Sequence, residues 1–288
     1  MVVSVSPVVL VSGRMHVCGA TRVLRRIFYV SRRASLAAIV SSMKNILVIQ
    51  SRSRKEMIEA EQSEYRRALR DPAVSFISTL DDTRAWNDPA AMLNSVDGVI
   101  IGGSGEFDLD GGRSHDDPAC VTARRILERL RPLVEYALAE NVPLLGICLG
   151  HQYMADMSGG SVSNDISQKK TGTFSVTLTN EGKGDPLFSL LPEAFLAQYG
   201  HKDSVTKLPK GGVVLASSPQ CAFSALRYGE KAYSVQFHPE LTAGDVLWKI
   251  EHTPGYLPEN SDVQSLVKES PEASRLLPLF VSKIVSAA

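Results

Sequence analysis

A cysteine stands between two glycines where an apolar run gives way to a helical pattern. The sequence Gly-Ile-Cys-Leu-Gly spans residues 146–150, with Cys148 at its centre and an apolar run at 142–147. A strand, a sharp turn and a helix form a nucleophile elbow, and glycines permit its tight backbone. The N-terminus of a helix favours the thiolate, which is the attacking form of cysteine. The pattern therefore predicts nucleophilic chemistry at Cys148, rather than the buried structural role common for a lone cysteine.

A histidine and a glutamate near the other end of the chain could complete such a site. A β-like run at 233–237 leads into His238, Pro239 and Glu240. Histidine can take a proton from a thiol and return one to a leaving amine near neutral pH. A carboxylate bonded to its far ring nitrogen fixes the tautomer and steadies the imidazolium. The segment therefore predicts a base and its orienting acid.

A glycine-rich turn follows the apolar run at 97–101. Its sequence is Gly-Gly-Ser-Gly, residues 102–105. Acyl transfer places negative charge on the former carbonyl oxygen, and backbone N–H groups stabilise that charge. The turn is a candidate oxyanion site, with an ordinary strand-to-loop turn as the alternative. Neither of the common phosphate-binding glycine patterns is met here.

The elements around these segments predict an α/β fold. Apolar runs without alternation are typical of strands buried on both faces of a parallel sheet. Such runs are expected at 45–50, 73–79, 97–101 and 142–147, and helices at 56–70, 118–140 and 149–157. Their alternation predicts a doubly wound, mostly parallel sheet flanked by helices.

Several features modify this scheme. Pro132 predicts a kink or a break in the long helix. Shorter β-rich runs that could extend the sheet as antiparallel or mixed strands occur at 173–179, 212–217, 222–228 and 231–237, and the tail 241–288 reads mostly helical. The three chemistry-bearing segments can meet at the carboxyl edge of the sheet, where open α/β sheets place their sites.

The order of these motifs over residues 44–240 resembles a class I glutamine amidotransferase domain of the GMP synthetase type. The resemblance implies a flavodoxin-like architecture, in which Cys148 attacks glutamine to form a γ-glutamyl thioester. It implies that His238 and Glu240 complete the triad, and that the N–H groups of Gly103 and Leu149 form the oxyanion hole. It assigns the substrate contacts to Gln152, Gly105, His201, Lys202 and Asp203. Many relatives have Pro at the position of Ser104 and Gly at that of Lys202.

The resemblance leaves the substrate and the partner open. Only 48 residues follow Glu240 and none reads as a synthetase domain, so we expect an ammonia acceptor on a separate chain, or none. The same triad could hydrolyse a γ-glutamyl peptide, or another amide or ester. An inactive regulatory protein is the remaining alternative, although all three triad residues are present. No metal, cofactor or nucleic-acid partner is predicted.

Composition sets the first 43 residues apart. They contain six arginines and no Asp or Glu, whereas residues 44–288 hold 25 basic and 31 acidic residues. Such a segment is typical of a mitochondrial transit peptide, unless translation begins at Met43 or the segment has another role. In each case we expect it outside a single domain at 44–288. Four dispersed cysteines and no long apolar run indicate a reducing compartment, such as the cytoplasm, and no membrane span.

Overall fold

A computed structural model describes residues 44–70, 73–253 and 263–287. The amino-terminal extension predicted at 1–43 lies outside the described residues, and its role stays a prediction. Within the described ranges, no helix is both long and apolar enough to cross a membrane.

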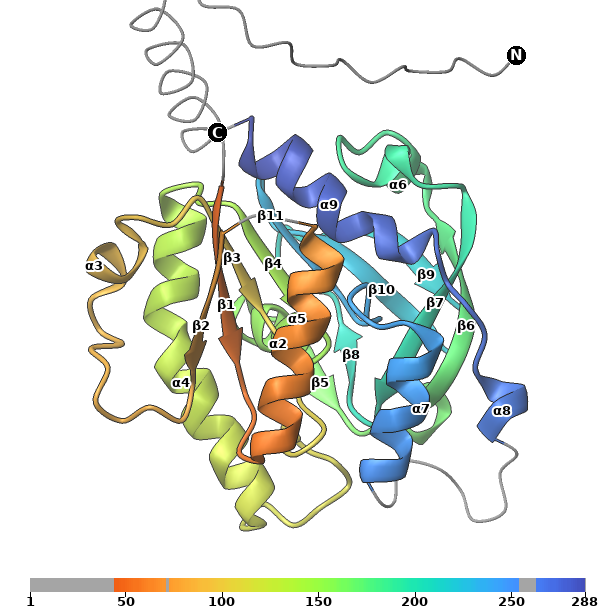
Figure 1. The fold of residues 1–288 in the computed structure, drawn as a ribbon, viewed down its shortest axis with the longest axis horizontal. Coiled ribbons are helices and arrows are strands. Elements are labelled where there is room, and N and C mark those ends of the chain that lie inside the picture. The colour runs from red at the N-terminus through yellow and green to blue at the C-terminus, as the bar shows by residue number, and fades with distance from the viewer. Residues whose placement is uncertain (1–43, 71–72, 254–262, 288) are drawn as a thin grey trace, which may run out of the picture. The chain divides into compact units, whose positions relative to one another are not determined.

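One large sheet of nine strands organises the described residues, in the order β2-β1-β3-β4-β11-β10-β9-β6-β7 (Figure 1). Five neighbouring strands run parallel: β2 (Ala73–Ser78), β1 (Asn45–Gln50), β3 (Gly98–Ile101), β4 (Leu144–Ile147) and β11 (Ala232–Val235). Four more continue the sheet in antiparallel pairing: β10 (Cys221–Arg227), β9 (Val213–Ser218), β6 (Lys170–Leu178) and β7 (Ala194–His201). A separate pair is formed by β5 (Ser161–Ser163) and β8 (Ser204–Lys207).

The side chains of the parallel strands divide between two apolar cores, because successive residues of a strand face opposite sides of a sheet. Ile46 and Val48 of β1 enter one core, and Leu47 and Ile49 enter the other. Both cores exclude solvent almost completely, and each aliphatic side chain so buried contributes about 1.5–3 kcal/mol. This double burial explains why the runs lack polar alternation.

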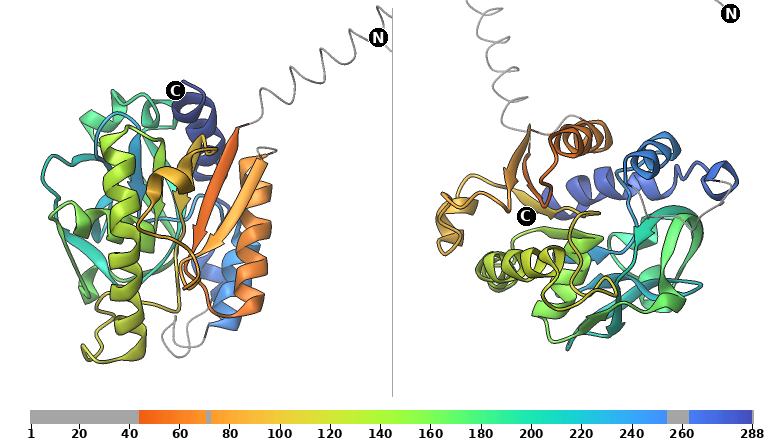
Figure 2. Two further views of the ribbon diagram at one scale, coloured as in Figure 1. Left: turned by 90° about the vertical axis from the view of Figure 1, so that its left-hand side faces the viewer. Right: turned by 90° about the horizontal axis from the view of Figure 1, so that it is seen from below.

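Helices cover both faces of the sheet, as Figure 2 shows from below. The first core packs against α2 (Lys55–Leu69) and α9 (Leu276–Phe280), and the second against α3 (Pro89–Leu93), α4 (Pro118–Ala139) and α5 (Leu149–Met157). Next to α2 lies α7 (Ala243–His252), which is joined to it by ion pairs. Shorter helical segments are α6 (Asn180–Lys183), η1 (Ile166–Gln168), η2 (Phe188–Leu190), α8 (Val263–Leu266), η3 (Ala273–Arg275) and η4 (Val281–Val285). The doubly wound α/β prediction is confirmed, with the antiparallel strands added at one side.

The helix α4 runs unbroken through Pro132. Proline removes one backbone hydrogen bond from a helix interior. Eight buried side chains of α4 hold it against the sheet and outweigh that local loss: Cys120, Ala123, Ile126, Leu127, Leu130, Leu133, Val134 and Ala137. Of the two outcomes predicted for Pro132, a break is therefore excluded.

Candidate active site

Cys148 occupies a strained turn between β4 and α5. Its φ of 53° and ψ of −101° lie in a region that non-glycine residues rarely adopt, at a cost of about 1–3 kcal/mol. The surrounding backbone fixes this conformation, because the Cys148 amide donates to Val235 (2.9 Å) and its carbonyl accepts from Gln152 (3.0 Å). The turn leaves Cys148 only 3% exposed, immediately before the first residue of α5.

The glycine before the cysteine is required by packing. A Cβ on Gly146 would lie 2.7 Å from the carbonyl carbon and oxygen of Gly150. Contacts this short with backbone atoms cannot be relieved by rotating a side chain, so the elbow needs glycine at this point.

His238 lies beyond the end of β11, and its Nδ1 is 2.7 Å from Oε1 of Glu240. Both residues are buried, at 7% and 3% exposure. Burial by itself lowers the pKa of His238. Glu240, Cys148 and the hydrogen bonds to both outweigh burial and raise the pKa of His238 to about 10. With Nδ1–H donated to Glu240, the other ring nitrogen is available to the sulfur.

Gly103 closes the site from the third segment. A Cβ on this glycine would lie 3.0 Å from Cε1 of His238 and 3.2 Å from Cβ of Cys148. The neighbouring Gly102 amide donates to the carbonyl of Ile49 (3.0 Å), whereas the Gly103 amide has no acceptor within the described ranges. Leu149 is the first residue of α5, where helix amides have no intrahelical partner. The sequence-predicted oxyanion residues thus flank the cysteine.

Ser104 shapes the loop after Gly103. Its hydroxyl accepts hydrogen bonds from the amides of Glu106 (3.1 Å) and Phe107 (3.3 Å). Such side-chain-to-backbone bonds stabilise a turn, and they give Ser104 a structural role in this loop.

The predicted substrate contacts fall into two groups. Gly105 lines the pocket described below. Among the others, Gln152 Nε2 and His201 Nδ1 lie 2.8 and 3.0 Å from the carbonyl oxygen of Asp203. The Asp203 carboxylate accepts from two backbone amides, and Lys202 Nζ is 3.2 Å from Asp108. These four residues hold one another and nearby loops, and none of them lines the pocket; their substrate roles stay predictions.

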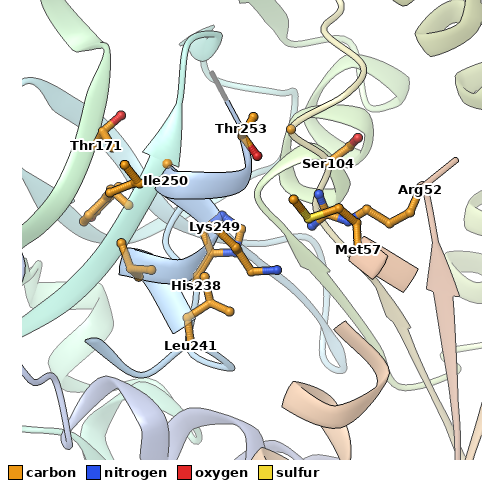
Figure 3. Close-up of a pocket in the computed structure, with 13 residues that line it drawn as sticks. Arg52, Met57, Ser104, Thr171, His238, Leu241, Lys249, Ile250 and Thr253 are labelled. Atoms are coloured by element: carbon orange, nitrogen blue, oxygen red, sulfur yellow. The ribbon is translucent and has the colours of Figure 1, made fainter. Parts of the chain in front are cut away.

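A small pocket with a cavity volume of about 60 Å³ opens beside His238 (Figure 3). Its wall continues from the glycine loop and His238 to the start of α2 and to α7. The lining residues are Arg52, Met57, Ser104, Gly105, Thr171, Tyr199, Gly200, His238, Leu241, Val246, Lys249, Ile250 and Thr253. Sequence reasoning missed most of them. Leu241 and α7 follow Glu240 directly in the chain, and Arg52 follows the carboxyl end of the parallel strand β1. Their places in the sequence could therefore have predicted that they lie near the site.

A buried polar cluster lies between α2 and α7. Arg52 donates twice to Glu61 (3.1 and 3.0 Å), and Lys249 Nζ lies 3.0 Å from Glu64. Burial raises the pKa of Glu64 to about 7; Lys249 opposes this shift and Glu240 adds to it. Oε2 of Glu64, Oε2 of Glu240 and the hydroxyl of Tyr65 are buried without a hydrogen-bond partner in the described part of the chain.

A family model described as glutamine amidotransferase class-I matches residues 85–246, more than half of the chain. The chain belongs to this family. The matched region contains the elbow, the glycine loop and the His-Pro-Glu segment.

Relatives in this family include proteins named as subunits of glutamine-hydrolyzing GMP synthases. The chain is 34% identical to such a protein from Archaeoglobus fulgidus and 35% to one from Methanopyrus kandleri, over 53% and 54% of this chain and 71% and 72% of those proteins. It is 37% identical to the corresponding protein of Methanocaldococcus jannaschii over 40% of this chain, and it spans 60% of that relative. It spans 22% of the GMP synthase of Thermosipho melanesiensis.

Solved structures of amidotransferases share the fold. A glutamine amidotransferase from Thermotoga maritima matches with a TM-score of 0.61 at 21% identity, over 84% of this chain and 98% of that one. One from Methylobacillus flagellatus matches with a TM-score of 0.53 at 20% identity, over 85% and 91%. These likenesses confirm the predicted amidotransferase architecture.

Proposed function

We propose that this amidotransferase hydrolyses the side-chain amide of glutamine through a thioester on Cys148, releasing glutamate and ammonia. The observation that carries the proposal is the placement of His238, which bonds Glu240 at 2.7 Å and faces Cys148 at the strained elbow. A buried thiolate–imidazolium pair is the reactive state of a cysteine hydrolase.

In the first half-reaction the Cys148 thiolate attacks the amide carbon of glutamine. The carbonyl oxygen takes up the negative charge, and the amides of Gly103 and Leu149 stabilise it. His238 already carries a proton and gives it to the amide nitrogen as the C–N bond breaks. Ammonia leaves, and the γ-glutamyl group remains bound to sulfur.

In the second half-reaction the neutral His238 accepts a proton from water, and the resulting hydroxide attacks the thioester carbon. The same amides stabilise the new oxyanion. When the C–S bond breaks, glutamate leaves and the thiolate–imidazolium pair is restored. Glu240 keeps the imidazole in one tautomer through both steps.

The acceptor of the ammonia is the second part of the proposal. Several relatives are named as separate subunits of a glutamine-hydrolyzing GMP synthase, which supports a synthetase on another chain as the partner. The alternative of a γ-glutamyl peptide hydrolase uses the same triad, because its scissile bond is also a γ-carboxamide.

The test is incubation of the purified full chain with glutamine, with the Cys148→Ser variant as the control. Release of glutamate and ammonia in equal amounts by the wild type alone supports the proposal. If neither product appears and no γ-glutamyl thioester can be trapped on Cys148, the proposal is wrong.

A further inference from the structure

The carboxylate of Glu240 uses only one of its two oxygens on His238. Oε1 lies 2.7 Å from His238 Nδ1, whereas Oε2 is buried without a hydrogen-bond partner among the residues that the structure describes. A buried carboxylate oxygen that receives no donor carries the cost of its lost hydration. The groups behind Glu240 therefore affect how firmly it holds the imidazole.

The helix α2 lies directly behind Glu240. Arg67 of α2 donates to the backbone carbonyl of Glu240 (3.3 Å) and pairs with Asp245 of α7. Glu64 and Tyr65 precede Arg67 on the same helix, and both are buried. The orienting acid of the site is thus held between α2 and α7.

The hydroxyl of Tyr65 lies beside the glycine loop. A Cβ on Gly102 would be 3.3 Å from the hydroxyl oxygen of Tyr65. Gly102 directly precedes Gly103, the proposed oxyanion residue. A change at this hydroxyl is therefore next to the catalytic backbone.

Tyr65 can act only as a donor here. Burial, followed by the charge of Glu240, raises the pKa of Tyr65 well above its ordinary value; Glu61 and Glu64 add to this effect and Arg52 opposes it. The hydroxyl therefore keeps its proton. Within 44–70, 73–253 and 263–287 it has no acceptor.

Glu61, the other carboxylate beside Gly102, already has its donors. Its Oε1 accepts from Arg52 (3.1 and 3.0 Å), and its Oε2 accepts from Gln50 (2.8 Å). Because both oxygens are engaged, Glu61 has less need of the Tyr65 hydroxyl than a carboxylate with a free oxygen.

Glu64 supplies such an oxygen, as Glu240 does. Its Oε1 lies 3.0 Å from Lys249 Nζ, whereas its Oε2 is buried without a partner in the described ranges. One donor, on Tyr65, thus accompanies two carboxylate oxygens in one buried layer. A single water can accept from the tyrosine and donate to both carboxylates. Buried waters typically make about three hydrogen bonds to such otherwise unsatisfied groups.

We propose that Tyr65 is a positioning residue for the glutaminase reaction, which holds Glu240 against His238 through one bound water shared with Glu64. This inference rests on the proposed function, because it assumes that Glu240 orients the catalytic imidazole. It gives α2 a part in the chemistry, although no residue of α2 contacts the reacting atoms.

Tyr65→Phe deletes only the hydroxyl. With one donor fewer, more of the Glu240 charge faces the imidazolium, so the pKa of His238 should rise. The alkaline limb of kcat/KM for glutamine should move to higher pH, opposite to the shift expected when the carboxylate itself is removed. A less firmly held imidazole should lower kcat about tenfold or more with little change in KM.

Tyr153→Phe is the matched control. Tyr153 is equally buried, and its hydroxyl donates to the carbonyl of Ala123 (3.0 Å) in the other core. This variant loses a hydrogen bond that the structure shows, so it should melt at a lower temperature than the wild type. It should keep kcat and the alkaline limb, because its hydroxyl has no part in orienting Glu240.

Two measurements that need no turnover separate this inference from the proposed function. An NMR titration of the full chain should show a higher pKa for His238 in Tyr65→Phe than in the wild type. A high-resolution crystal structure of the wild type should show one water bonded to Tyr65, Glu64 and Glu240.

An unchanged pKa of His238, or separate partners for Tyr65 and Glu240 in the crystal, overturns the inference. If wild-type protein hydrolyses glutamine and Tyr65→Phe matches its kcat and alkaline limb, the inference likewise fails while the glutaminase proposal stands. If the wild type releases no glutamate and forms no thioester, the proposed function fails, and with it the role of Tyr65 in this reaction.

Discussion

A Cβ on Gly150 would lie 2.2 Å from the carbonyl oxygen of Ile101. The first turn of α5 is thus in direct backbone contact with the end of β3. This contact sets the spacing between the cysteine elbow and the loop that carries Gly103. Catalytic geometry must hold to within fractions of an ångström, so we expect Gly150 to be a positioning residue for the proposed oxyanion site.

We therefore expect Gly150→Ala to lower kcat at least about 100-fold and to destabilise the fold by about 1–3 kcal/mol, as overpacking does. Gly184→Ala is the matched control, because its Cβ would meet nothing closer than 3.8 Å and its φ is −97°. Steady-state kinetics and urea denaturation check both variants. Near-wild-type kcat in Gly150→Ala would show that the contact has no catalytic importance.

Much of this arrangement could be predicted from the sequence because its signals are local. The apolar run 45–50 and the helix at 149–157 match β1 and α5 in their bounds. The glycine-flanked Cys148 and the segment ending at Glu240 each specify a strand end, and parallel strands bring their carboxyl ends to one edge.

The parts that could not be predicted depend on distant partners. The strand β7 was missed because polar residues interrupt its apolar ones. Gln198 is fully buried, and its Nε2 donates to Lys268 (2.6 Å) and Ser270 (3.1 Å), far along the chain. The pocket was missed for a similar reason. Lys249 is buried against Glu64 of a helix far away in sequence, and nothing near Lys249 in the chain indicates that pairing.

Cys148→Ser tests the nucleophile. The neutral hydroxyl lacks the reactivity of a thiolate, so turnover should fall by about 10³-fold or more while the fold is retained. Glutamate release measures the first effect and a circular dichroism melt the second. Hydrolysis at the wild-type rate would remove the catalytic assignment of Cys148.

Glu240→Gln tests the orienting acid. The variant should keep slow, measurable hydrolysis, because His238 remains but its tautomer and charge are no longer fixed. Glu240 raises the pKa of His238, so removing the carboxylate should lower that pKa. The protonated ring is the form that pairs with the thiolate. The alkaline limb of kcat/KM against pH should therefore move to lower pH in the variant, and an unmoved limb with wild-type rates would make Glu240 structural only.

Glu64 provides a test through stability. Burial raises its pKa from an ordinary 4.5 to about 7. When the pKa of a group is higher in the folded protein than in the unfolded chain, its contribution to stability is fully present below the unfolded-state pKa. That contribution is lost as the pH rises through the folded-state pKa. The wild type should thus lose up to about 3 kcal/mol between pH 4.5 and pH 8 through this group, at 1.36 kcal/mol per pKa unit.

Glu64→Gln removes this titration and keeps the shape of the side chain. Its free energy of unfolding, from urea denaturation at pH 5 and pH 8, should change less with pH than that of the wild type. The variant should gain relative stability at pH 8, where the wild-type carboxylate is ionised in a buried cluster. Parallel pH dependence in the two proteins would mean that Lys249 holds Glu64 ionised throughout, and that its pKa is not raised in the fold.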